Sequence, residues 1–180
     1  MGANLGGVIG GFVCDNFPLL GMARSNMVRG VLKDARSTNC THMLFLDTDV
    51  VIGPDVPQRL LAHGRSIVSA LYFERRFPYR GVYRYKDGEE GPLPGTVPVQ
   101  GLLPVELLGF GCVLIDLAVL RAMEDPWFVM EKVGEDFHFC RKAREKGFSM
   151  FVDCATEVQH VGTVPIGRAE AYALSRIKPL

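Results

Sequence analysis

Two hydrophobic patterns alternate along most of the chain. Short apolar runs, typical of buried strands, are separated by segments whose apolar residues recur every three or four positions, as in amphipathic helices. The apolar runs predict strands at residues 8–13, 43–46, 67–73, 112–115 and 149–152. The helical spacing predicts helices at residues 22–35, 54–63, 117–123 and 135–146. Because strands and helices alternate, the pattern predicts an α/β fold with an open, mainly parallel sheet flanked by helices.

Residues 74–104 depart from this alternation. Five of the eleven prolines fall in this segment, which favours a long loop. Residues 83–88 have the pattern of a strand leading into a turn, so we expect a hairpin within the loop. Loops of this length are uncommon in compact domains unless they have a function or are disordered. The chain has neither a linker nor a repeat, and we expect residues 1–180 to form a single domain.

Charge and cysteine content narrow the classes of function. Twenty Lys and Arg residues balance twenty Asp and Glu residues, so no overall field attracts nucleic acid, and we expect no nucleic-acid partner. The five cysteines form no CxxC pair and lie mostly in apolar runs, as reduced thiols do, which favours a cytoplasmic location. The apolar stretch at residues 5–14 is far shorter than the ~20 residues that span a bilayer, so we expect no transmembrane segment.

Two acidic residues, Asp47 and Asp49, directly follow the apolar run at residues 43–46. Ligands of open α/β sheets bind just beyond the carboxyl ends of the strands, so both side chains are candidate ligand contacts. Two carboxylates this close repel each other unless a cation lies between them, and their oxygens suit Mg²⁺ or Mn²⁺. The alternative is structural: the acids end the strand, and Asp49 forms an Asx-turn into the bend that follows.

Two further polar features lie nearer the C-terminus. Glu135 and Asp136 open a predicted helix directly after Gly134. Acids in a first helical turn complement the helix dipole, so on the residues alone they are either structural or catalytic. His160 follows the last predicted strand, and a lone histidine is either a hydrogen-bonded structural residue or a metal ligand.

Together these features resemble the GT-A-fold glycosyltransferases, especially the family 2 type and its short phage and microbial relatives. In that family a strand ends in a DxD motif, here at residues 47–49, and a Gly-Glu-Asp helix start and an H-x-G motif follow, here at 134–136 and 160–162. The segment Ala23-Arg24-Ser25-Asn26 is similar to the family's Ala-Arg-Asn helix start. Only 22 residues precede Ala23, so the implied GT-A-like, Rossmann-like sheet is abbreviated at its N terminus.

The resemblance implies a metal-dependent enzyme of the hexosyltransferase type with a nucleotide-diphosphate sugar as donor. Asp47, Asp49 and His160 would hold Mn²⁺ or Mg²⁺. The ion would neutralise the donor's diphosphate as the bond to the sugar breaks. Arg24 would bind the donor together with Asp47 and Asp49.

The same resemblance assigns the catalytic residues. Asp136 would be the base that takes the proton of an acceptor hydroxyl, in a reaction that inverts the anomeric configuration. Glu135 would orient the helix or contact the acceptor. The acceptor would be a glycan, a lipid or a small molecule, and we expect residues 74–104 to select it.

Two alternatives stay open at this point. Residues 47–51 also resemble the DxDx[TV] motif of haloacid dehalogenase-like phosphatases, in which Asp47 would be the nucleophile. That motif normally lies near the N terminus and precedes a G-D-x-x-x-D pair, whereas here Gly134-Glu135-Asp136 is followed by His138 and Cys140. The abbreviated N terminus also fits a degenerate GT-A domain that acts as a binding or structural module.

Overall fold

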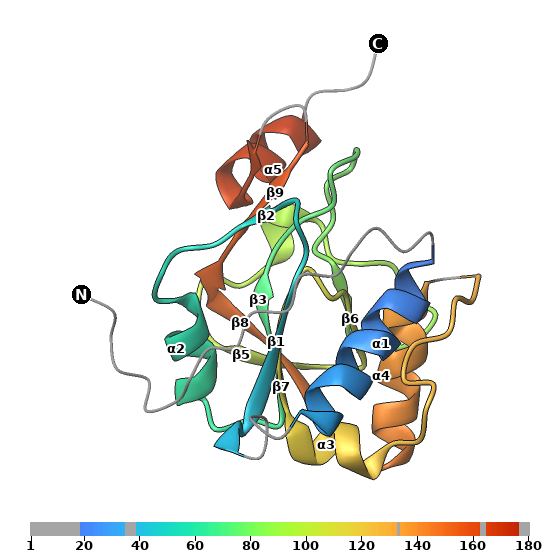
Figure 1. Cartoon of the computed structure of the whole chain (residues 1–180). Coiled ribbons are helices and arrows are strands. Elements are labelled where there is room, and N and C mark those ends of the chain that lie inside the picture. The colour runs from blue at the N-terminus through green and yellow to red at the C-terminus, as the bar shows by residue number, and fades with distance from the viewer. Residues whose placement is uncertain (1–18, 35–38, 133, 163–164, 177–180) are drawn as a thin grey trace.

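The computed structural model describes residues 19–34, 39–132, 134–162 and 165–176 (Figure 1). Within these ranges the chain forms a mixed α/β fold, in which a central sheet packs against helices on both faces. The strand expected at residues 8–13 lies outside the described residues. No helix in the described part combines the length and the apolar character needed to cross a membrane.

The central sheet is mixed rather than mainly parallel. Its strands in the described ranges are β1 (His42–Leu46), β3 (Ile67–Leu71), β5 (Leu102–Val105), β7 (Cys112–Asp116) and β8 (Met150–Glu157). They lie in the order β1-β7-β3-β8-β5. Strands β3 and β8 are parallel, whereas the other neighbouring pairs are antiparallel. The prediction of an α/β fold is confirmed, and the prediction of a mainly parallel sheet is wrong.

The path of the chain between β3 and β7 explains this difference. Parallel neighbours need a crossover connection, usually a helix, but the chain returns from β3 to β7 mainly through loops and short strands. Strand β7 therefore runs back between β1 and β3. Helices still cover both faces of the sheet, so β3 is buried at all five positions. A continuous apolar run indicates that a strand is buried on both faces, but it does not indicate the direction of the strand.

The sheet separates the core into two layers, and helices cover both of its faces. The helices of the described ranges are α1 (Leu20–Lys33), α2 (Val56–Ala62), α3 (Leu117–Ala122), α4 (Glu135–Glu145), α5 (Arg168–Ser175) and the 3₁₀ helix η2 (Pro94–Thr96). Along β1, Phe45 packs into the layer formed with α1, α3 and α4, and Leu44 packs on the opposite layer with Leu60 of α2. Figure 1 shows α1, α3 and α4 grouped on one side of the sheet and α2 on the other. This division follows from the alternation of side chains along a strand.

Short strands complete the fold. Strands β2 (Val50–Val51), β9 (Gln159–Val161) and β10 (Pro165–Ile166) form one small sheet, and β4 (Tyr83–Arg84) pairs with β6 (Leu107–Leu108) in another. A strand does begin at Tyr83, as the sequence predicts, but its partner lies beyond the expected loop and not within it. In the first small sheet His160 lies opposite Val50, which follows Asp49 directly.

Four phenylalanines, Phe45, Phe110, Phe128 and Phe139, form a buried aromatic cluster beneath α1 and α4. Their ring centroids lie 4.9 to 5.5 Å apart, mostly in edge-to-face contact. The guanidinium of Arg24 lies over the Phe110 ring, 5.4 Å from its centroid. The cluster therefore forms the floor on which the Arg24 side chain lies.

We expect Phe110→Ala to lower the free energy of unfolding by about 3–5 kcal/mol, because it removes a fully buried ring at the centre of this cluster. Guanidinium denaturation monitored by circular dichroism measures the loss. Met130→Ala is the control, since Met130 is 55% exposed, and should change the free energy by less than about 0.5 kcal/mol. Equal losses in the two variants would contradict the assignment of the cluster to the core.

Candidate functional site

The predicted site residues gather near one edge of the central sheet. Strands β1 and β3 both run antiparallel to β7, so their carboxyl ends lie at the same edge. Asp47 follows β1 and Tyr72 follows β3. Pairing of β9 with β2 brings His160 to this edge, where the backbone N–H of Val161 donates to the carbonyl of Asp49 over 2.7 Å. The folded chain thus joins its first acidic motif to its C-terminal histidine.

A buried arginine, Arg24, links the end of β1 to the start of α4. Its Nη2 donates to Oδ1 of Asp47 over 2.8 Å, and its Nη1 donates to Oε1 of Glu135. Arg24 is 4% exposed and Glu135 is 5% exposed. Since an unpaired buried charge is strongly unfavourable, these contacts hold the Asp47 carboxylate and the first residue of α4 in a fixed relation.

This ion pair bears on two of the predicted roles. Arg24, predicted to bind the donor, directs its guanidinium to two carboxylates of the chain itself. Glu135, predicted to be catalytic, is buried against Arg24. In this arrangement Glu135 orients the helix start, which is one of the two roles expected for it, and donor binding by Arg24 stays a prediction.

Two glycines allow this close approach. A Cβ on Gly21 of α1 would lie 3.2 Å from both the Glu135 Cβ and the Phe128 carbonyl oxygen, so a larger residue would push α1 away from α4. Gly134 precedes α4 with a φ of +108°, a conformation that L side chains rarely adopt. The Gly-Glu-Asp sequence therefore combines a sharp turn, a buried ion-pair partner and a carboxylate.

Asp49 and His160 lie together, as the sequence predicts. His160 Nε2 is 3.5 Å from Oδ2 of Asp49, and its Nδ1 lies 2.9 Å from the carbonyl oxygen of Phe73. Because a carbonyl only accepts hydrogen bonds, Nδ1 is the donor of this contact, and Nε2 is the ring nitrogen that faces the carboxylate. A histidine that is fixed through its other ring nitrogen is typical of metal ligands.

Asp47, the third predicted metal ligand, directs Oδ1 to Arg24 instead. Asp49 also forms an ion pair of 2.8 Å with the half-exposed Arg75. In the described part of the chain no three side chains of His, Cys, Asp or Glu are grouped as a metal site would need. Metal binding by Asp47, Asp49 and His160 therefore stays a prediction, and Asp49 and His160 are the two of these residues that the fold brings together.

Asp136 has an unusual environment for a carboxylate. Burial and the neighbouring charge of Glu135 raise its pKa to about 6, while the backbone N–H of Phe137, which donates to its Oδ1 over 2.8 Å, opposes this shift. The charge of Arg24 opposes it as well. A carboxylate with a pKa near 6 is mostly ionised at neutral pH and still basic enough to accept a proton from a bound substrate.

The sequence analysis did not select Tyr72 or Arg75, and both lie in the site. Tyr72 is 5% exposed, and its hydroxyl accepts a hydrogen bond of 3.0 Å from the backbone N–H of Gly111. A signal for Tyr72 was present in the chain, because Gly109 and Gly111 flank Phe110, and glycines at such spacing often mark a close approach. Arg75 lies in the loop after β3 and carries no such signal.

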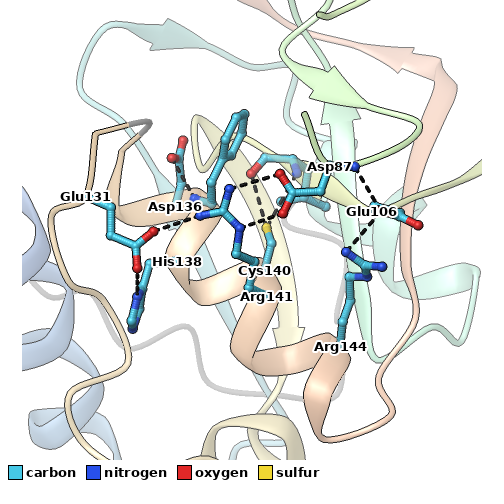
Figure 2. A network of polar contacts seen from close by, with 10 residues as sticks. Asp87, Glu106, Glu131, Asp136, His138, Cys140, Arg141 and Arg144 are labelled. Atoms are coloured by element: carbon cyan, nitrogen blue, oxygen red, sulfur yellow. Dashed lines mark hydrogen bonds and ion pairs between the residues drawn. The ribbon is translucent and has the colours of Figure 1, made fainter. Parts of the chain in front are cut away.

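A network of surface ion pairs connects α4 to neighbouring segments of the chain. Figure 2 shows Arg141 between Asp87 and Glu131, at 2.6 and 2.7 Å, and Arg144 against Glu106 at 3.0 Å. The network connects α4 both to the turn at Asp87 and to the chain before the helix. Because Asp87 belongs to the predicted loop at residues 74–104, that loop is anchored to the helix that begins with Asp136.

We expect the Arg24–Glu135 pair to be strongly coupled. Arg24→Met should lower the free energy of unfolding by about 3–5 kcal/mol, because it leaves Glu135 buried without its partner. The double variant with Glu135→Gln should lose about 1–3 kcal/mol less than the sum of the single losses. Urea denaturation of the four proteins measures this coupling.

The pair Arg29–Asp125 is the control for this cycle, because Arg29 lies in the same helix but the pair is exposed. Arg29→Met and Asp125→Asn should couple by less than about 1 kcal/mol. Additive losses at Arg24 and Glu135 would contradict a structural role for the buried pair.

We expect Asp136→Asn to stabilise the protein above pH 6. The folded state raises the pKa of Asp136 from 3.8 to about 6, so the parent loses stability as the pH rises through this window, because the folded state then binds more protons than the unfolded state. The variant lacks this loss, so its advantage should reach roughly 1–3 kcal/mol at pH 8 and disappear near pH 4.

Thermal denaturation at a series of pH values measures the difference. Glu124→Gln, which removes the charge of an exposed acid, should follow the parent at every pH. An advantage of Asp136→Asn that stays constant between pH 4 and pH 8 would show that the pKa of Asp136 is not raised.

Comparisons with known proteins bear on the fold alone. No protein-family model matches the chain, and no curated protein does. Among solved structures, the crystal structure of A197 from STIV is similar, with a TM-score of 0.59 and 19% sequence identity. The similarity covers 79% of this chain and 67% of A197. The chain therefore shares the arrangement of its helices and strands with a protein of very different sequence.

Proposed function

We propose that the chain is a metal-dependent glycosyltransferase that transfers a sugar from a nucleotide-diphosphate sugar to a hydroxyl acceptor with inversion at the anomeric carbon. The observation that carries this proposal is the bridge from Asp47 through Arg24 to the start of α4. This bridge fixes the acidic motif after β1 relative to the helix that carries Asp136. A transferase of this kind needs both groups near one substrate, one for the diphosphate and one for the acceptor.

Asp49 and His160 support the metal-dependent part of the proposal. Asp49 Oδ2 and His160 Nε2 lie 3.5 Å apart, and carboxylate oxygens are ligands that Mn²⁺ and Mg²⁺ prefer. An ion held there would replace Arg75 Nη1 as the partner of Oδ2. The ion, when bound, supplies positive charge for the diphosphate that leaves with the electron pair of the sugar bond. Residues 72 and 73 hold the histidine ring in place, and Arg75 adds a second positive charge beside Asp49.

Asp136 is the proposed base. The acceptor hydroxyl gives its proton to the Asp136 carboxylate while its oxygen attacks the anomeric carbon from the face opposite the diphosphate. The bond from the anomeric carbon to the diphosphate oxygen breaks in the same step, and the configuration inverts. The pKa of Asp136, raised to about 6 mainly by burial, favours this role at neutral pH. Glu135 keeps the helix start in position through Arg24.

The loop at residues 74–104 is the proposed acceptor-selecting segment. Its turn at Asp87 is tied to α4 by Arg141, so it lies along the helix of the proposed base. The acceptor would be a hydroxyl of a glycan, a lipid or a small molecule.

Cys112, Cys140 and Cys154 are buried thiols, and a cytoplasmic site of action would keep them reduced.

We expect the full chain to transfer sugar from at least one nucleotide-diphosphate sugar in the presence of Mn²⁺, with an inverted product anomer by NMR. Asp136→Asn should lower kcat by ~10²–10⁴ and leave the affinity for the nucleoside diphosphate nearly unchanged, because a base acts only in the transition state. Glu124→Gln is the matched control and should retain parental turnover. Calorimetry with nucleoside diphosphates, with and without Mn²⁺, measures the binding.

Four results would contradict the proposal. A product that keeps the donor's configuration, or an Asp136→Asn variant with parental turnover, would remove Asp136 as the base. A beryllium fluoride adduct at Asp47 would indicate a phosphatase of the haloacid dehalogenase type. No binding of any nucleotide would favour a binding or structural module.

A further inference from the structure

Tyr72 contacts two parts of the candidate site, the turn that holds Asp47 and the ring of His160. It follows β3 directly, and its carbonyl accepts a hydrogen bond of 3.1 Å from the Val82 backbone N–H. Its side chain turns into the core and is 5% exposed. The charges of Asp47 and of Asp136 both act on its hydroxyl, so the side chain lies within electrostatic reach of the acidic motif and of the proposed base.

We infer that Tyr72 is a positioning residue of the proposed glycosyltransferase site, which fixes Asp47 through its hydroxyl and His160 through its ring. This inference rests on the proposed function for its catalytic consequence. Its geometric part, the coupling of Tyr72 to Asp47 and to His160, rests on contacts alone. The two parts can therefore be tested separately.

The hydroxyl reaches Asp47 through two hydrogen bonds in series. The Gly111 backbone N–H donates to Oη of Tyr72 over 3.0 Å, and the Gly111 carbonyl accepts from the backbone N–H of Asp47 over 3.0 Å. A Cβ at Gly109 would lie 2.2 Å from this Oη, and a Cβ at Gly111 would lie 2.8 Å from Cζ of the ring. The turn before β7 therefore packs closely around Tyr72, and its hydrogen bond to the Asp47 N–H fixes the backbone of Asp47.

The ring reaches His160 directly. The two rings are in edge-to-face contact, with centroids 5.5 Å apart and planes at 82°. The next residue, Phe73, accepts the Nδ1–H of His160 through its carbonyl over 2.9 Å. Residues 72 and 73 thus fix both the plane of the imidazole and the nitrogen that holds the proton. The remaining nitrogen, Nε2, is thereby presented to Asp49.

The hydroxyl is the part of Tyr72 that packing does not require. A phenylalanine would fill the same space and keep the ring contact, whereas a buried hydroxyl is unfavourable unless it is hydrogen-bonded. Burial, together with the carboxylates Asp136 and Asp47, raises the pKa of Tyr72 above its ordinary value, so the hydroxyl stays neutral. Its function in this structure is to satisfy the Gly111 N–H and so to hold the turn.

Tyr72→Phe separates the two contacts, and Tyr83→Phe is the matched control. Tyr83 is 1% exposed and lies in β4, and its hydroxyl lies 3.4 Å from that of Tyr85. Both substitutions remove one hydroxyl from a buried tyrosine and keep the ring. The first readout needs no substrate: backbone amide hydrogen exchange of Asp47 and Gly111, followed by NMR on the full chain.

Tyr72→Phe should accelerate exchange of both amides about tenfold or more beyond any change in global stability, because the Gly111 N–H loses its acceptor and the turn loosens. Tyr83→Phe should leave both amides as in the parent. The second readout is transfer with Mn²⁺: kcat of Tyr72→Phe should fall about 10- to 100-fold, with a much smaller change in the acceptor KM, since misplaced groups act mainly on the transition state.

Unchanged exchange at Asp47 in Tyr72→Phe would overturn the inference, whatever the activity. Accelerated exchange with a kcat equal to that of Tyr83→Phe would also overturn it, because Tyr72 would then be only structural. A parent that neither transfers sugar nor binds nucleotide refutes the proposed function instead. In that case the exchange data still decide whether Tyr72 positions Asp47.

Discussion

The arrangement of the candidate site depends on a buried positive charge that has to be neutralised. Arg24 is enclosed by α1 and by the rings of Phe110 and Phe128, so its guanidinium meets almost no water. Asp47 and Glu135 supply the compensating charges, from positions 23 and 111 residues away in the chain. These buried ion pairs add little net stability, but a buried charge left without its partner would be strongly unfavourable. The ion pairs therefore restrict which folds are possible. The end of β1 and the start of α4 are therefore found together.

The direction of the strands determines which other residues lie close to Asp47. Since β7 runs antiparallel to both β1 and β3, these two strands end at the same edge, and residues 47–49 come close to residues 72–73. Pairing of β2 with β9 adds His160. Each of these contacts joins segments that are far apart in the sequence, and each brings a polar group to one edge of the sheet.

The sequence predicted those features that depend on burial and on local conformation. Helices α1 to α4 and strands β1, β3, β7 and β8 agree with the prediction, because apolar periodicity indicates which residues face inward. Strand β5, expected to be part of the loop at 74–104, and helix α5 were missed. The direction of β7 was missed, since a strand covered on both faces has the same apolar run in either direction. The pairing of Glu135 with Arg24 and the contact of Tyr72 with Gly111 were missed because these partners are distant in the chain, and no local pattern records such contacts.

The proposed glycosyltransferase needs Asp49, His160 and Asp136 to act on one substrate. A crystal structure of the full chain soaked with Mn²⁺ and a nucleoside diphosphate tests it most directly, because the anomalous signal of manganese locates the ion without assumptions. We expect an anomalous peak within coordination distance of the Asp49 carboxylate and of His160 Nε2, with the diphosphate on the ion and open space for a sugar between the diphosphate and Asp136. A diphosphate bound at a distant surface, or an ion held by neither Asp49 nor His160, would contradict it.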